Sequence, residues 1–264
     1  MKETILNIVE EKAMKEGFDP LLVVESGSRA WGFASEDSDY DVRFVYRYNL
    51  SSYLNLFPPS DNRRFSLDID GADIDGAGWD VYKFFKLLLK SNCQALEWLE
   101  IASSDFLYFA DKYFVENVRQ ILFCHRAVSW REVLFHYAGL ADHEKTSWLD
   151  DEVIVKKYLY MVRSILCCEW VDKRQSMPPI NLFDLIQLRD KSDDDGCNYL
   201  AEKALELAEL KKSTEKTTME FDSKLAETIQ SKIVHFRQRA METGGMRVSH
   251  TIFDSYLRTL MKEK

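Results

Sequence analysis

Two aspartates, Asp39 and Asp41, stand one residue apart in an alternating run that ends at Tyr46. Residues i and i+2 of a β-strand point to the same face, so both carboxylates share one face with Arg43. The residues of the opposite face are apolar and are expected to face the core: Tyr40, Val42, Phe44 and Tyr46. This pattern predicts a strand that presents two carboxylates on its open side.

Carboxylates whose backbones lie about 6 to 7 Å apart on one strand face repel each other, and a divalent cation relieves that repulsion. Mg²⁺ is held by one or two carboxylates together with the phosphates of a substrate. Two metal ions about 3.5 to 4 Å apart can clamp the attacking and leaving oxygens of an in-line displacement. The spacing therefore predicts a site for Mg²⁺ or Mn²⁺ at Asp39 and Asp41.

A glycine turn at Gly27 and Ser28 precedes the two aspartates by about ten residues. Glycine lets the backbone bend and approach a ligand closely, and Ser28 offers a hydroxyl. The residues that follow are expected to open a helix, whose free N–H groups favour anions. The turn is predicted to hold the tail of a nucleoside triphosphate, such as ATP, beside the metal ions.

Residues 1 to about 100 must position these groups, and they mix helix and strand signals. Apolar residues at helical spacing predict a helix over residues 5–15, and short strands are expected at 21–25 and 39–46. The stretch FSLDIDGADIDGAGWD, residues 65–80, is typical of one or two strands with turns. Asp80 is expected to cap the helix that follows it.

The chain is expected to be almost wholly helical from about residue 111 onward, where glycines become rare. Long amphipathic helices are predicted at 113–140 and 151–173, and further helices at 180–188, 198–211 and 217–242. The predicted fold class is α+β, with a small catalytic domain over residues 1–110 and a mainly helical domain over residues 111–264.

The composition is that of an ordinary globular protein, with 46% hydrophobic and 30% charged residues among 264. No apolar run reaches the length of about 18 residues that a transmembrane helix needs, and the acidic N-terminus does not resemble a signal peptide. We therefore expect a cytoplasmic protein with no membrane association. Five cysteines without a CxxC pair indicate neither a disulfide framework nor a zinc ribbon.

A net charge of −9 argues against broad, non-specific binding to nucleic acid. An acidic protein can still carry local basic patches that bind nucleic acid. The candidates for such patches are Arg63–Arg64, Lys156–Lys157 and Lys173–Arg174.

The order of Ser26-Gly27-Ser28, a gap of about ten residues and Asp39-Tyr40-Asp41 resembles the DNA polymerase β-like nucleotidyltransferase superfamily. Three stretches are similar to one branch of it, the predicted nucleotidyltransferases of bacteria and phages associated with RNA repair. These stretches are GSRAWGFASEDSDYDVRFVY, GWDVYKFFKLLLKSNCQALEWL and VKKYLYMVR, and the resemblance covers about residues 20 to 170. It implies a polymerase β-like catalytic domain with a short mixed sheet.

The resemblance also implies a third carboxylate on a neighbouring strand, which can act as general base. Asp73 fits the family pattern best because Ile74 and then a turn and a helix follow it. Asp75 shares the face of Asp73 by alternation and remains open. The other acids of this stretch are Asp68, Asp70 and Asp80, of which Asp80 is better explained as a helix cap.

Further nucleotide-binding candidates flank these motifs. Arg29 either contacts a phosphate or pairs with an acid, and Ser38 either shapes the loop or positions the nucleotide. A stripe beside the apolar face of the helix predicted at 151–173 contains Lys156, Tyr160 and Arg163. The lysine and the arginine are expected to contact the triphosphate, and the tyrosine is expected to contact the base or the sugar. The alternative is that the stripe is simply exposed to solvent. Trp31 and Phe33 are better explained by packing than by base stacking.

The sequence thus predicts a metal-dependent nucleotidyltransferase in which Asp39, Asp41 and Asp73 bind the metal and Gly27 and Ser28 bind the β- and γ-phosphates. An acceptor hydroxyl would attack the α-phosphorus of a nucleoside triphosphate, and pyrophosphate would leave. The family association favours an RNA end as acceptor. The alternatives are transfer to a protein hydroxyl or a small molecule, or a non-catalytic relative that binds nucleotide or RNA; a protein partner is not predicted.

Overall fold

The computed structural model describes residues 1–144, 152–189, 195–245 and 249–262. The chain divides into two compact units, each made of separate segments. Unit 1 contains residues 1–30, 39–128 and 246–264, and unit 2 contains residues 31–38 and 129–245. The chain therefore leaves unit 1 for eight residues, immediately before Asp39, and leaves it again after residue 128.

A five-stranded mixed sheet in the order β3-β4-β2-β1-β5 forms the centre of unit 1. Its strands are β1 (Phe18–Ser26), β2 (Tyr40–Tyr48), β3 (Asn62–Ile69), β4 (Ala72–Asp80) and β5 (Leu107–Ala110). β2 runs parallel to β4, whereas the other neighbouring pairs are antiparallel. Two short helices interrupt the strands, α2 (Gly27–Ala30) after β1 and α3 (Leu50–Tyr53) after β2.

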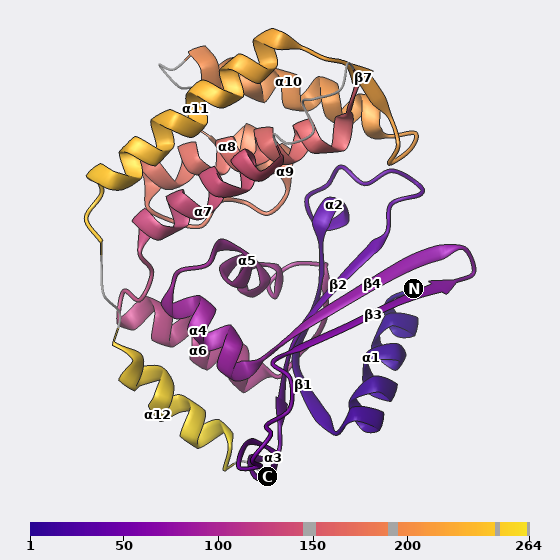
Figure 1. Ribbon diagram of the computed structural model, residues 1–264, viewed down its shortest axis with the longest axis vertical. Helices are drawn as coiled ribbons and strands as arrows, with labels where there is room; N and C mark the ends of the chain where they lie inside the picture. The colour runs from indigo at the N-terminus through magenta and orange to yellow at the C-terminus, as the bar shows by residue number, and fades with distance from the viewer. Residues whose placement is uncertain (145–151, 190–194, 246–248, 263–264) are drawn as a thin grey trace. The chain divides into compact units, whose positions relative to one another are not determined.

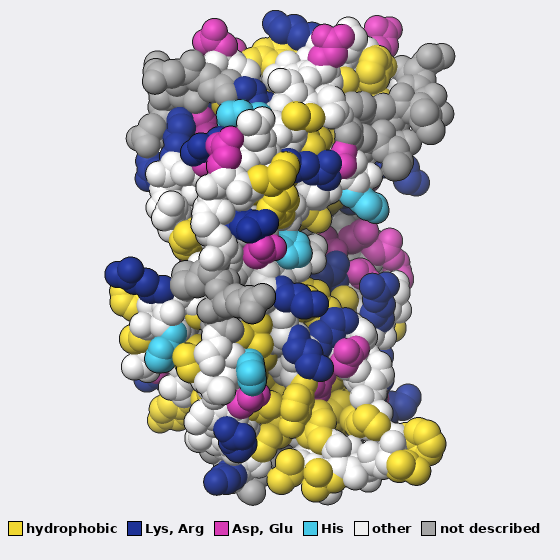
Figure 2. All heavy atoms as spheres, turned by 60° about the vertical axis from the view of Figure 1, so that its left-hand side comes forward, with side chains coloured by type: hydrophobic (Ala, Val, Ile, Leu, Met, Phe, Trp, Pro, Cys, Tyr) yellow, Lys and Arg dark blue, Asp and Glu magenta, His cyan; other side chains and the backbone are white. Residues whose placement is uncertain are grey.

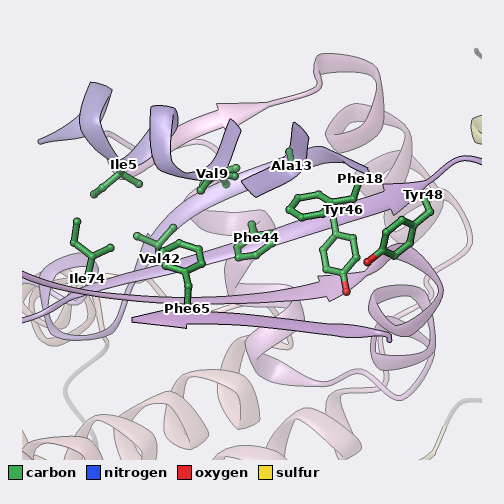
Figure 3. Close-up of a cluster of buried hydrophobic side chains, with 11 residues drawn as sticks. Ile5, Val9, Ala13, Phe18, Val42, Phe44, Tyr46, Tyr48, Phe65 and Ile74 are labelled. Atoms are coloured by element: carbon green, nitrogen blue, oxygen red, sulfur yellow. The ribbon is translucent and has the colours of Figure 1, made fainter. Parts of the chain in front are cut away.

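One face of the sheet is covered by the N-terminal helix α1 (Lys2–Glu16), as Figure 3 shows. Its apolar residues Ile5, Val9 and Ala13 pack on the alternating apolar side of β2, which includes Phe44 and Tyr46. The apolar side of β2 therefore faces the core, as the alternation of apolar residues in the sequence predicts. Removing these side chains from water provides the main favourable free energy for this layer.

The opposite face carries the aromatic pair Trp79 and Trp98, whose rings stack with centroids 4.0 Å apart. The helices of unit 1 after the sheet are α4 (Val81–Leu89), α5 (Cys93–Ile101), α6 (Lys112–Cys124) and α12 (His250–Leu260). α12 lies beside α4 and α6 (Figure 1), and Phe253 meets Phe85 with ring centroids 5.1 Å apart. The C-terminal helix thus returns to the unit that contains the N-terminus.

A tight turn at Asp70 and Gly71 joins β3 to β4, and both residues have positive φ, 53° and 83°. Positive φ at both central positions is the geometry of a type I′ hairpin turn, which favours Asp-Gly. The turn sets the register of β4 against β3. In the separate parallel pairing of β4 with β2, Asp75 lies opposite Asp41. Asp80 caps α4, as predicted, by accepting a hydrogen bond from the Tyr82 N–H at 2.9 Å.

Unit 2 is mainly helical. Its helices are α7 (Trp130–His143), α8 (Val155–Arg174), α9 (Leu182–Leu188), α10 (Asp195–Lys211) and α11 (Ser223–Glu242). A small antiparallel sheet pairs β6 (Glu152–Ile154) with β7 (Thr218–Glu220). α8 is the central helix, since it packs against α7, α10 and α11.

The predicted α+β class with a short mixed sheet and a helical part is confirmed. The units differ from the predicted domains 1–110 and 111–264, because α6 and α12 pack in unit 1 and residues 31–38 in unit 2. The single helix predicted over 113–140 is wrong: α6 and α7 are separated at Arg126, which has a φ of 48°. The start predicted for α8, Asp151, lies outside the described residues. In the described part of the chain, no helix combines the length and apolarity needed to cross a membrane.

Candidate active site

The carboxylate of Asp41 lies directly against the backbone of Gly27. A Cβ atom built on Gly27 would stand 1.9 Å from Asp41 Oδ2, well inside van der Waals contact. Gly27 also has a φ of 63°, in the left-handed region that side chains rarely adopt. The turn therefore needs glycine for two reasons, and it brings the first predicted motif into contact with the second.

Asp75 is the acid that the sheet register places beside Asp41. The two residues are partners in the parallel β2–β4 pair. Arg43 lies between their side chains: its Nη2 is 2.7 Å from Asp41 Oδ1 and its Nη1 is 3.0 Å from Asp75 Oδ2. Arg43 follows Asp41 by two residues on the same strand, so alternation puts the guanidinium on the face of the carboxylates.

The remaining predicted acids occupy other positions. Asp39 lies just before β2 and is exposed, and its carbonyl oxygen accepts a hydrogen bond from Arg29 Nε at 3.1 Å. Asp73 is exposed and lies opposite Asp68 of β3. Asp70 lies in the hairpin turn. Asp80 caps α4 and also accepts a hydrogen bond from the Tyr53 hydroxyl at 2.6 Å.

Ser28 and Arg29 belong to α2, which is a single turn of helix. Ser28 is buried. Arg29 bonds the backbone of Asp39, and its guanidinium lies 3.8 Å from the centre of the Tyr40 ring. The predicted phosphate-binding arginine thus joins the glycine turn to the start of β2, inside unit 1.

A buried glutamate, Glu25, lies behind Asp41. Its Oε1 accepts a hydrogen bond from the Asp41 N–H at 2.8 Å, and its Oε2 accepts one from the Tyr108 hydroxyl of β5. Burial raises the pKa of Glu25 to about 7, although the hydrogen bonds from Tyr108 and Asp41 oppose the rise. Glu25 therefore fixes the backbone of β2 at the residue whose side chain enters the site.

In unit 2, Ser38 lies in a polar cluster that anchors the loop of residues 31–38. Its buried hydroxyl accepts hydrogen bonds from the Ser35 N–H at 2.9 Å and from Lys211 Nζ at 3.2 Å, and donates one to Glu215 Oε1. Lys211 is fully buried and also contacts Glu215 Oε1 at 2.9 Å. The Ser38 hydroxyl is therefore part of the loop structure.

The predicted stripe of α8 meets the same loop. Lys156 forms an ion pair with Glu215. Tyr160 meets Trp31 edge-on with ring centroids 5.0 Å apart, and the guanidinium of Arg163 lies 4.3 Å from the centre of the Trp31 ring. The stripe and residues 31–38 thus come together within unit 2.

Two carboxylates of this unit have lowered pKa values. Burial opposes the ionisation of Glu215, but the hydrogen bonds from Lys156, Ser38 and Lys211 outweigh it and lower the pKa of Glu215 to about 2. Hydrogen bonds from the Thr214 hydroxyl, from Ser35 and from the backbone of Glu215 lower the pKa of Asp37 to about 2. Both residues stay ionised at neutral pH and hold the loop to the segment that follows α10.

Comparison with known proteins assigns the chain to a family. A family model described as the RNA repair pathway DNA polymerase beta family, RlaP, matches residues 1–259. The chain belongs to the RlaP family. It is 35% identical over 188 residues to "Uncharacterized protein YcgL" of Bacillus subtilis (strain 168), covering 70% of this chain and 69% of the relative. A solved structure, that of a nucleotidyltransferase-like protein from Exiguobacterium sibiricum 255-15, is similar with a TM-score of 0.34 and 11% identity, covering 100% of this chain and 80% of that chain.

Membership of RlaP makes the glycine turn and the strand acids of unit 1 the candidate active site of a polymerase β-like nucleotidyltransferase. Carboxylate oxygens are the donors that Mg²⁺ and Mn²⁺ prefer, and Asp41 and Asp75 supply them from neighbouring strands. Within the described ranges, no group of three or more His, Cys, Asp or Glu side chains is assembled to hold a metal. The donors present fit a metal ion whose remaining ligands are substrate phosphates and water.

Three features were missed by the sequence interpretation, two of them in the candidate site of unit 1 and one in unit 2. Glu25 had a usable signal, since it is the one charged residue within the apolar run before Ser26. The alternation of β2 puts Arg43 on the face of the acids, but it does not indicate that the guanidinium contacts both Asp41 and Asp75. Lys211 and Glu215 had no signal, because a lysine and a glutamate four residues apart are ordinary on a polar helix.

Proposed function

We propose that this protein transfers a nucleoside monophosphate from a nucleoside triphosphate to an acceptor hydroxyl. The observation that carries the proposal is the contact between the glycine turn and the strand acid, in which Asp41 Oδ2 occupies the space beside Gly27. A phosphate tail at the turn would then lie next to the carboxylates. The RlaP family assignment supports the same chemistry.

In the proposed reaction, Gly27 and Ser28 hold the β- and γ-phosphates. Asp39, Asp41 and a third acid, on β4, would bind the metal. A bound Mg²⁺ or Mn²⁺ supplies positive charge that stabilises the reacting phosphate. The acceptor oxygen forms a bond to the α-phosphorus, the bond between that phosphorus and the α–β bridging oxygen breaks, and pyrophosphate leaves. A carboxylate takes the proton of the attacking hydroxyl.

For the third acid, we propose Asp75 in place of the predicted Asp73. Asp75 lies opposite Asp41 in the sheet register and shares the Arg43 guanidinium with it, whereas Asp73 lies opposite Asp68 near the hairpin turn. A base must lie within hydrogen-bond reach of the proton that it removes, so the acid nearer to Asp41 is the better candidate.

For the acceptor, we propose an RNA end, in line with the RNA repair pathway named in the family description. Transfer to a protein hydroxyl or a small molecule is the alternative enzymatic reaction. Ser38, Lys156, Tyr160 and Arg163 remain predicted nucleotide-binding residues, with their side chains engaged in unit 2 as described.

The test is incubation of the protein with Mg²⁺ or Mn²⁺ and each α-labelled ribonucleoside triphosphate in turn. Parallel reactions contain a short RNA with free 3′ and 5′ hydroxyls, bulk protein, or no added acceptor. We expect label on the RNA and release of pyrophosphate, both dependent on the metal. Label only on protein supports the alternative acceptor, and absence of transfer in every reaction contradicts the proposed function.

A further inference from the structure

Arg43 holds the two acids of the candidate site together. Its Nη2 contacts Asp41 Oδ1 at 2.7 Å, and its Nη1 contacts Asp75 Oδ2 and the Asp75 carbonyl oxygen, each at 3.0 Å. Nη1 also donates to the Val42 carbonyl oxygen at 3.2 Å. The guanidinium is thereby tied to the backbone of both strands as well as to both carboxylates.

The charge of this contact matters because Asp41 and Asp75 are partners on neighbouring strands. Facing carboxylates repel, and a cation that contacts both relieves the repulsion. An arginine stays protonated throughout the physiological pH range and presents its donors in a planar fork, so one guanidinium can serve two carboxylates. The Arg43 side chain is 20% exposed, compared with 24% for Asp41 and 51% for Asp75, so solvent screens the Asp41 contact less.

We propose that Arg43 is the resident counter-cation of the acidic site. It aligns Asp41 and Asp75 before the metal ion arrives, and it gives up these carboxylates when the metal ion binds. Arg43 and a divalent cation would compete for the same oxygens, so Arg43 is a positioning residue that lowers metal affinity while it stabilises the metal-free site. The inference rests on the proposed function, because it requires the acids to bind a metal.

The experiment measures Mn²⁺ binding by calorimetry and thermal unfolding with and without Mn²⁺, at constant ionic strength and without substrate. The variants are Arg43→Met, which removes the charge, and Arg43→Lys, which keeps a charge but loses the planar fork. Arg64→Met is the control, because it removes the same single positive charge as Arg43→Met. Arg64 is exposed on β3 opposite Ala77, hence on the same sheet face.

We expect Arg43→Met to bind Mn²⁺ about tenfold more tightly than the wild type, a change of about 1.4 kcal/mol, because the guanidinium no longer competes for the oxygens of Asp41 and Asp75. Without metal its melting temperature should fall by about 2 to 4 °C, and Mn²⁺ should raise it by more than in the wild type. Arg43→Lys should bind about threefold more tightly, and Arg64→Met should match the wild type.

A purely structural role for Arg43 would give the opposite result, because a distorted site binds metal more weakly. Wild-type or weaker Mn²⁺ affinity in Arg43→Met overturns the inference and leaves the proposed metal site intact. If Arg43→Met does not fold, the same criterion applies to Arg43→Lys. If the wild type itself binds no Mn²⁺, the proposed metal site fails and the inference fails with it.

Discussion

The candidate site depends on a glycine whose missing side chain makes room for a carboxylate. Gly27 has the left-handed backbone of a tight turn, and Asp41 Oδ2 fills the position that a Cβ atom would take. Gly27 therefore allows both the left-handed turn and the close approach of the Asp41 carboxylate. An additional methyl group at this position must displace either the turn or the carboxylate.

We expect Gly27→Ala to lower the free energy of unfolding by about 1 to 3 kcal/mol, because of the strained φ and the contact with Asp41. Transfer activity should be lost even where the protein remains folded, since Asp41 moves. Denaturant titration and the transfer assay measure the two effects.

Gly139→Ala is the matched control for this variant. Gly139 lies within α7, and a Cβ atom there would meet no atom within 4 Å. Alanine should stabilise the helix by about 0.5 to 1 kcal/mol and leave activity unchanged. Equal effects of the two substitutions on stability and activity would contradict a special role for Gly27.

At the scale of residues, the sequence predicts that Gly27 lies near the acids of β2, but it does not predict which acid of β4 lies beside Asp41. Alternation puts both Asp73 and Asp75 on the same side of β4. The choice between them depends on the register between β4 and β2, which places Asp75 opposite Asp41. Pairing across strands 34 residues apart is a tertiary property that a local pattern does not contain.

At the scale of elements, a network of charged and polar groups anchors the loop that leads into Asp39. Lys156 of α8 and Lys211 of α10 both bond Glu215, which also accepts a hydrogen bond from Ser38. The segment after α10 is thereby tied to residues 31–38. Such a network is stable only when all members are paired, because each buried group left unpaired costs about 1 to 3 kcal/mol.

This network predicts a pH dependence of stability. The pKa of Glu215 is about 2 in the folded protein, below its ordinary value of 4.5. A lowered folded pKa adds stability above pH 4.5, and that stability is lost as the pH falls from about 4.5 towards 2. Glu215→Gln should therefore be less stable than the wild type by about 1 to 2 kcal/mol at pH 7, with a difference that shrinks below pH 4.5.

Denaturant titrations of both proteins between pH 7 and pH 3 measure the difference. Glu209→Gln is the control, since Glu209 lies on α10 and is 71% exposed in its pair with Lys212. It should change stability little at any pH. A Glu215→Gln difference that stays constant over this range would show that its charge does not stabilise the network.

Elements with strong periodicity were predictable, and those that depend on distant partners were not. α1 and β2 follow the apolar spacing that predicts them. The break between α6 and α7 has no glycine or proline, and Arg126 adopts the left-handed backbone instead. The short strands β6 and β7 stabilise each other across more than sixty residues, so neither pattern alone indicates a sheet.

At the scale of the whole molecule, the protein is acidic, with a net charge of −9. Figure 2 shows Lys and Arg side chains interspersed with Asp and Glu on the face drawn. Basic groups that serve an RNA acceptor must therefore act locally. In unit 1, Arg63 is paired with Glu16 at 2.8 Å, whereas Arg64 is exposed on the sheet face that carries Asp75.

If RNA is the acceptor, binding of a short single-stranded RNA should weaken steeply as salt rises. Arg64→Gln should weaken binding and flatten the slope of log affinity against log salt by about 0.7, the value of one phosphate contact. Lys15→Gln is the control: Lys15 is exposed on α1, which covers the other sheet face. No measurable RNA binding at low salt would eliminate RNA as the acceptor.

The assignment of separate chain segments to the two units could not be predicted from the sequence. Residues 31–38 carry part of the most recognisable motif, GSRAWGFASEDSDYDVRFVY, yet they pack in unit 2. Phe33 is buried there and Trp31 contacts Tyr160, so the predicted packing role of these aromatic residues is confirmed. A motif that is continuous in sequence can therefore serve two compact units.

The most direct test of the proposed active site is a single-turnover measurement of nucleotide transfer by the wild type, Asp41→Asn, Asp75→Asn and Asp73→Asn. All three substitutions replace a carboxylate by an amide of nearly the same shape. We expect Asp41→Asn and Asp75→Asn to reduce the rate by at least about 100-fold, as loss of a general base or metal ligand does, and Asp73→Asn to stay within about threefold of the wild type. Circular dichroism confirms that each variant is folded. Wild-type rates in Asp41→Asn would contradict the site, and loss of activity in Asp73→Asn with an active Asp75→Asn would return the third acid to Asp73.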